Sequence, residues 1–135
     1  MKREVERKQQ LPAYSLTIAE LEVLIERLRA LFTEPENVRY SIDIELKSEK
    51  LTFDSIGELK AYAPLKGRVT EFYVRLYHSP RSIRISTIGM PFDRRSSVSA
   101  DGESEAWCAG AIETVQSFVQ SHKLWYHWFV SAPIG

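Results

Sequence analysis

The chain has 135 residues, of which 44% are hydrophobic and 27% are charged, and 18 basic residues balance 18 acidic ones. This length and composition predict one soluble globular domain and exclude a disordered, collagen-like or coiled-coil chain. A net charge of zero excludes a strong overall field for nucleic acid or anionic lipid, although residues 37–100 are mildly basic.

The single cysteine, Cys108, cannot form an internal disulfide, which indicates a reducing compartment. Residues 1–10 are charged and no apolar run follows them, so a secretory signal peptide is not expected. No stretch reaches the ~18 apolar residues that a membrane-spanning helix needs. We therefore expect a cytoplasmic protein, or a cytoplasmic domain at the inner face of a membrane.

The chain is expected to divide into three parts. Residues 1–13 are charged, lack apolar anchors and are expected to form a flexible lead. Residues 14–130 are expected to fold as a single α+β domain. Residues 131–135 carry no charge and are expected to be a tail, or the start of a membrane segment in a longer protein.

The first helix is predicted to begin after Thr17. Thr17 and Glu20 have the spacing of a capping box, and Leu16 and Leu21 have that of a hydrophobic staple. Pro35 lies beyond its end, because proline cannot continue a helix. The apolar residues recur at the spacing of one buried helix face: Ile18, Leu21, Leu24, Ile25, Leu28, Leu31 and Phe32.

The middle of the chain is predicted to form an antiparallel sheet. Apolar and polar side chains alternate there with the period of half-buried strands. Residues 78–81 have the length of a hairpin connection. We expect strands at residues 38–47, 51–53, 69–77, 82–88 and 95–99, the last a weak edge strand, and one helical turn at 55–62.

The last helix is predicted to begin after Asp101 or Ser104 and to extend to Val130, with apolar residues at helical spacing from Trp107 to Phe129. Together the elements predict an α+β fold. In it, an antiparallel sheet of four to five strands carries the N-terminal and C-terminal long helices on one face.

An aromatic run near the end of the chain is its least ordinary feature: Trp125, Tyr126, Trp128 and Phe129. Two explanations stay open. These side chains either lie at a membrane interface, where Trp and Tyr gather, or are buried within the domain, against a protein partner or against a second copy of the chain. The run is the predicted partner or membrane interface.

Three tyrosines and one histidine are the candidate pocket residues: Tyr40, Tyr73, Tyr77 and His122. A curved sheet beside the last helix can leave a cavity for an apolar ligand, which tyrosines on the strands would line. If the pocket were hydrolytic, His122 or His78 would be the titrating group.

Basic residues interleaved with Tyr73 and Tyr77 suggest a third use of the strands: Arg75, His78, Arg81, Arg84, Arg94 and Arg95. This combination suits phosphate contacts and base stacking. A solvated outer face of the sheet explains the same pattern, because acidic residues lie in the same region and no RNA-binding signature motif is present. Nucleic acid is therefore the least favoured partner.

The sequence contains no motif that indicates catalysis, a cofactor or a metal. Its glycines are isolated, which excludes a P-loop and a dinucleotide-binding fingerprint. The favoured interpretation is a non-enzymatic cytoplasmic module, regulatory or interacting, that joins a membrane anchor, a protein partner or a copy of itself. The alternative is a small-ligand-binding or hydrolytic protein with a pocket between the sheet and the last helix.

Overall fold

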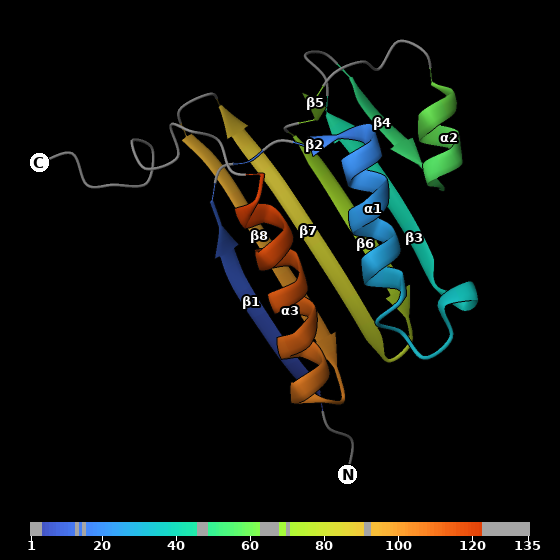
Figure 1. Cartoon of the computed structure of the whole chain (residues 1–135), viewed down its shortest axis with the longest axis vertical. Coiled ribbons are helices and arrows are strands. Elements are labelled where there is room, and N and C mark those ends of the chain that lie inside the picture. The colour runs from blue at the N-terminus through green and yellow to red at the C-terminus, as the bar shows by residue number, and fades with distance from the viewer. Residues whose placement is uncertain are drawn as a thin grey trace, which may run out of the picture.

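The computed structural model describes residues 4–12, 14, 16–45, 49–62, 68–69, 71–90 and 93–122. Within them an antiparallel sheet has the strand order β1-β8-β7-β6-β3-β4 (Figure 1). The predicted α+β class is confirmed, but the sheet has six strands and not four to five. The strands are β1 (Val5–Leu11), β3 (Arg39–Glu45), β4 (Lys50–Phe53), β6 (Phe72–His78), β7 (Arg81–Met90) and β8 (Asp93–Gly102).

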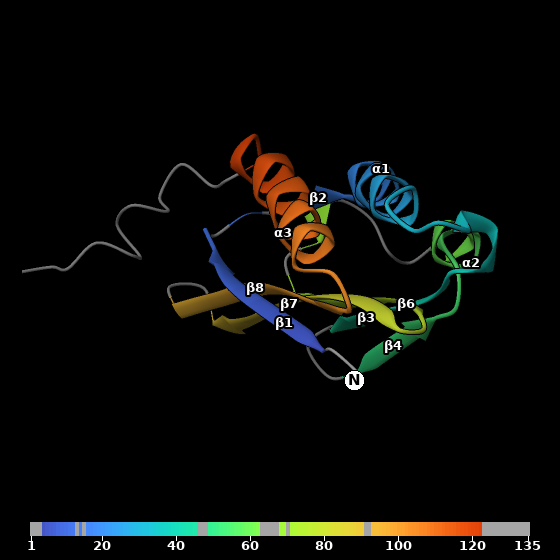
Figure 2. The same ribbon diagram turned by 90° about the horizontal axis from the view of Figure 1, so that it is seen from below.

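Two long helices, α1 (Ile18–Arg29) and α3 (Glu105–Gln120), lie on the same side of the sheet (Figure 2). The short helix α2 (Ile56–Ala61) follows edge strand β4, and a 3-10 turn, η1 (Pro35–Asn37), leads into β3. A separate two-stranded ladder joins β2 (Leu16–Thr17), at the start of α1, to β5 (Arg68–Val69).

Helix α1 begins with the predicted capping box. The Thr17 hydroxyl accepts from the Glu20 backbone N–H at 3.1 Å, and the Glu20 carboxylate accepts from the Thr17 N–H at 2.8 Å. Two backbone donors that the helix leaves unpaired are thereby satisfied. The four residues of α1 that are fully buried follow the predicted apolar stripe: Leu21, Leu24, Ile25 and Leu28.

The core fills the space between the sheet and the two helices. Strand alternation turns one set of side chains toward the helices, and the helical stripes meet them there. The central strands contribute Ile42, Ile44, Phe72, Val74, Leu76, Ile83, Ile85, Val98 and Ala100, and α3 contributes Cys108, Ala111, Ile112, Val115, Phe118 and Val119.

Helix α3, expected to extend to Val130, ends at Gln120, with Ser121 as its C-cap. Two further parts of the chain differ from the sequence expectation. Val5–Leu11, within the expected flexible lead, forms strand β1 and pairs with β8 along its whole length. As a result β8, expected as a weak edge strand at 95–99, extends over Asp93–Gly102 and lies inside the sheet between β1 and β7. Asp101 belongs to β8, and the cap of α3 is Ser104, whose hydroxyl accepts from the Trp107 N–H at 3.2 Å.

Both differences have a physical reason. Strand β1 lies at the edge of the sheet and is exposed at most positions. An edge strand needs few buried side chains, and its charged residues discourage pairing with other chains. Strand β8 turns the small side chains of Ser96, Val98 and Ala100 toward the core. Small residues permit the close packing of α3, but they give little of the apolar alternation that identifies a strand.

A buried hydroxyl network joins Tyr14 to the sheet. The Tyr14 hydroxyl lies 3.1 Å from the Thr87 hydroxyl, which lies 3.0 Å from that of Ser96. The Tyr14 side chain is fully buried, and its ring packs edge-on against Phe72. Burial raises the pKa of Tyr14, and the hydrogen bonds with Thr87 and Ser96 offset part of this rise.

The raised pKa of Tyr14 predicts a loss of stability at high pH. Above the ordinary tyrosine pKa of about 10, the unfolded chain releases this proton while the folded chain keeps it. The unfolded state then binds fewer protons, so the free energy of unfolding falls as pH rises, by at most about 1.4 kcal/mol per pH unit. Chemical denaturation of the wild type and Tyr14→Phe between about pH 9 and 11 measures this. An equal decline in both proteins would contradict the prediction.

Candidate functional site

The two faces of the sheet have different characters. One face packs against α1 and α3, and none of the helices in the described part of the chain covers the other (Figure 2). We call this second side the outer face. The strand register assigns to it the alternate residues of each strand, among them Glu6, Ser41, Asp43, Tyr73, Arg75, Tyr77, Arg84, Ser86, Ser99 and Asp101.

The register aligns a row of basic and hydroxyl side chains across the outer face. Arg75 on β6 lies between Ser41 on β3 and Arg84 on β7. Ser99 on β8 is the next neighbour of Arg84, and Lys8 on β1 is the neighbour of Ser99. We call these five residues the cationic row. With strands about 4.8 Å apart, the row is about 19 Å long.

Arg75 and Arg84 are direct cross-strand neighbours, an arrangement that is unfavourable for like charges. Arg84 is paired with Asp101 at 2.8 Å, which offsets part of the repulsion. The Arg75 guanidinium lies 5.5 Å from the centre of the Tyr77 ring and has no acidic partner among the described residues. Tyr77 itself is 43% exposed, so an apolar ring and an unpaired cation lie together at the surface.

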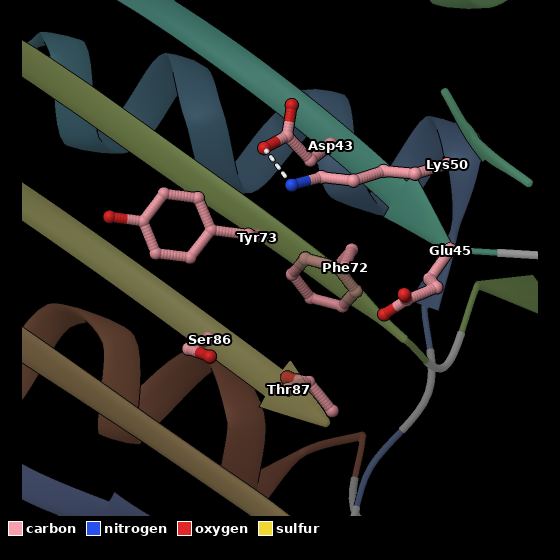
Figure 3. Close-up of a pocket in the computed structure, with 7 residues that line it drawn as sticks. All are labelled: Asp43, Glu45, Lys50, Phe72, Tyr73, Ser86 and Thr87. Carbon is pink, nitrogen blue, oxygen red and sulfur yellow. Dashed lines mark ion pairs between the residues drawn. The ribbon is translucent and has the colours of Figure 1, made fainter. Parts of the chain in front are cut away.

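A pocket of about 320 Å³ opens beside the cationic row, where β6 begins (Figure 3). The Lys50 ammonium lies 3.5 Å from a carboxylate oxygen of Asp43, and Figure 3 shows Glu45 apart from this pair. Two carboxylates, one ammonium group, the Tyr73 ring and the Ser86 hydroxyl therefore lie around one opening of the outer face. The pocket is lined by Asp43, Glu45, Lys50, Phe72, Tyr73, Ser86 and Thr87.

The four candidate pocket residues do not lie together. Tyr73 and Tyr77 are on the outer face, and of the four only Tyr73 lines the pocket. Tyr40 is turned toward the helices, where its hydroxyl accepts from the Ile56 N–H at 3.0 Å. His122 lies two residues beyond the end of α3 and contacts Glu20 of α1, on the helix side of the sheet.

His122 connects the end of α3 to the start of α1. Its Nε2 lies 2.6 Å from a carboxylate oxygen of Glu20, and its Nδ1 lies 2.8 Å from the carbonyl oxygen of Phe118. The ring also stacks on that of Phe118. The backbone hydrogen bond from Thr17, and to a smaller extent His122, lower the pKa of Glu20. This histidine joins two helices and does not face the pocket.

The basic residues proposed for nucleic-acid contact divide between the two faces. Arg75 and Arg84 are on the outer face, as described above. His78 lies 3.6 Å from Glu34, and Arg81 lies 2.7 Å from Glu103, whose pKa is lowered by the hydrogen bond with Arg81. The side chains of Arg94 and Arg95 are outside the described residues.

The space between the sheet and α3 holds apolar side chains. Ala100, Ala111 and Val115 are fully buried there. Cys108 is buried among them, and burial, together with the carboxylates of Asp101 and Glu103, raises the pKa of its thiol. A raised thiol pKa disfavours the thiolate, which is the reactive form of cysteine.

The predicted interface of Trp125, Tyr126, Trp128 and Phe129 lies outside the described residues. Among the residues that the structure does describe, no helix is long and apolar enough to cross a membrane. The same residues contain no group of three or more histidine, cysteine or acidic side chains that would hold a metal ion.

Comparison of the chain with protein-family models, curated proteins and solved structures gave no match. The geometry of the outer face therefore carries the functional argument.

Proposed function

We propose that the chain is a non-enzymatic interaction module that binds its partner through the outer face of the sheet. One observation carries the proposal: Arg75 on a central strand is exposed and has no acidic partner among the described residues, and it lies directly beside Arg84 and an exposed Tyr77 ring. If the outer face only contacted solvent, a pair of opposite charges at positions 75 and 84 would stabilise the sheet more than two arginines do. Arginine and tyrosine are also the residue types that contribute most to binding interfaces.

The two sides of the sheet have different roles in stability. The helix side holds the core, and its contacts stabilise the fold. The outer face buries less apolar surface, because its side chains are polar or only partly buried. Substitutions on the outer face therefore cost little stability. All of the cationic row except Lys8 lies on strands that are held in place by pairing on both sides.

The C-terminal aromatic run is a second proposed contact, independent of the outer face. Trp125, Tyr126, Trp128 and Phe129 would meet a protein partner, a second copy of the chain or a membrane interface. In the membrane case the module would work at the cytoplasmic side, and the outer face would be free to recruit a partner.

Site-specific photo-crosslinking in the cells that make the protein tests the role of the outer face. A benzophenone amino acid at Ser99, on the outer face, is expected to give a discrete adduct, because a bound partner lies within reach. The matched control carries it at Glu113, an exposed position of α3 on the other side. Digestion of the adduct with protease or nuclease identifies the partner's class. Equal yields at the two positions, or none at Ser99, would contradict the proposal.

A further inference from the structure

We propose that the outer face binds a single-stranded nucleic acid, with phosphates along the cationic row and one base in the pocket beside Tyr73. This inference rests on the proposed function, because it names the partner class of the same face. Nucleic acid is the partner that the sequence pattern favoured least. The strand register now favours it, because it aligns Lys8, Ser41 and Ser99 with Arg75 and Arg84 in one row.

The cationic row has the composition of a phosphate track. Lys8, Arg75 and Arg84 supply three cations, and Ser41 and Ser99 supply hydroxyl donors between and beside them. No acidic residue belongs to the row itself, but Asp101, on the same face, pairs with Arg84 at 2.8 Å. The two adjacent guanidinium groups repel each other in the free protein, and a phosphate between them would exchange that repulsion for charge-assisted hydrogen bonds.

Two tyrosines flank the row on the strand that carries Arg75. Tyr73 and Tyr77 are two residues before and after Arg75, so all three side chains project from the same face. Tyr77 is exposed and Tyr73 is half-buried. Aromatic rings at the surface of the central strands of a sheet are stacking surfaces for unpaired bases. Duplex bases are already stacked on each other, which is why a single strand fits this arrangement better.

The acidic pocket selects among the bases. Asp43 is the cross-strand neighbour of Tyr73, and Glu45 lies nearer Phe72 (Figure 3). Lys50 pairs with Asp43 at 3.5 Å, so the pocket holds two carboxylates and one ammonium group. Carboxylates repel phosphate, which keeps the backbone on the cationic row, but they accept hydrogen bonds from an exocyclic amino group such as that of cytosine. Uracil has a carbonyl oxygen at the same position, so cytosine is expected to bind more tightly in the pocket.

Fluorescence anisotropy with labelled oligocytidylate and oligouridylate of about 12 nucleotides tests the inference. The folded full-length chain is expected to bind both, oligocytidylate more tightly, with affinity that falls as salt rises. Arg75→Gln should weaken binding about tenfold and reduce the slope of log affinity against log salt by about 0.7. Tyr73→Ala should also weaken binding, and Tyr73→Phe should retain it, because the phenyl ring still stacks.

The matched control is Lys60→Gln, which removes one positive charge from α2 at a distance from the outer face. Lys60 is exposed and pairs with Glu22 on α1. This variant should bind like the wild type. Circular dichroism establishes that each variant is folded, and Tyr77→Ala on the exposed side of β6 provides a second test if a Tyr73 variant does not fold.

Two results would overturn the inference: no binding of either oligonucleotide by the folded chain, or equal losses for Arg75→Gln and Lys60→Gln. Binding of polyglutamate or of phosphatidylserine vesicles in place of the oligonucleotides, lost in Arg75→Gln, would also overturn it and would leave the outer face as the binding surface. If the probe at Ser99 gave no crosslink to any partner, the proposed function of the outer face as an interaction surface would itself be contradicted.

Discussion

Replacement of Leu28 by alanine is expected to lower the free energy of unfolding by about 2 to 5 kcal/mol. Leu28 lies in the last full turn of α1, and its side chain is fully buried. The substitution removes apolar atoms and leaves a cavity that the surrounding helices and strands can only partly fill, and both effects destabilise the folded state. Because single domains are stable by about 5 to 15 kcal/mol, the loss is a large fraction of the whole.

The control for Leu28 lies in the same helix. Val23 is 45% exposed, so Val23→Ala tests the effect of an alanine substitution in α1 without the loss of core contacts. It should change stability by less than about 0.5 kcal/mol. Denaturation with urea measures both variants. If Leu28→Ala were as stable as Val23→Ala, α1 would not pack on the sheet as the structure describes.

Patterns that act within one element could be predicted from the sequence. The capping box at Thr17 and Glu20 and the apolar stripe of α1 depend on residues a few positions apart, and the structure contains both. The hairpin of β6 and β7 is equally local. Strand β1 could not be predicted in this way. Its pairing with β8 joins residues 97 positions apart in the sequence (Val5 with Gly102), and its exposed side chains carry no apolar pattern.

The candidate site shows the same limit. The sequence indicated Tyr73 and Tyr77 and six basic residues as one interleaved group. The register places Tyr73, Tyr77, Arg75 and Arg84 on the outer face, whereas His78 and Arg81 belong to the other side of the sheet. Lys8, Ser41 and Ser99 were missed, since only the lateral order of the strands brings them into one row. The grouping of Tyr40 and His122 with the other tyrosines failed because the residues lie on different sides of the sheet. Tyr40 and His122 are on the helix side, and Tyr73 and Tyr77 are on the outer face.

The buried hydroxyl network supplies the other large expected effect. Thr87→Val keeps the volume of the side chain and replaces the hydroxyl by a methyl group, and it is expected to cost about 1 to 3 kcal/mol. The Thr87 hydroxyl is the neighbour of both Tyr14 and Ser96, at 3.1 and 3.0 Å, and all three residues are buried. Water cannot replace the lost partner there, so the desolvation cost of the Tyr14 hydroxyl is no longer fully offset.

A double-mutant cycle separates this effect from a change in packing. In the Tyr14→Phe background the phenolic hydroxyl is absent, so Thr87→Val should cost less than in the wild type, with a coupling energy between about 0.5 and 3 kcal/mol. If the two substitutions were additive, the hydroxyls of Tyr14 and Thr87 would not share a hydrogen bond. Thr87 also lines the pocket beside Tyr73. A coupling in this range would establish that the hydroxyls of Tyr14 and Thr87 share a hydrogen bond in the folded state, at a residue that also lines the proposed base pocket.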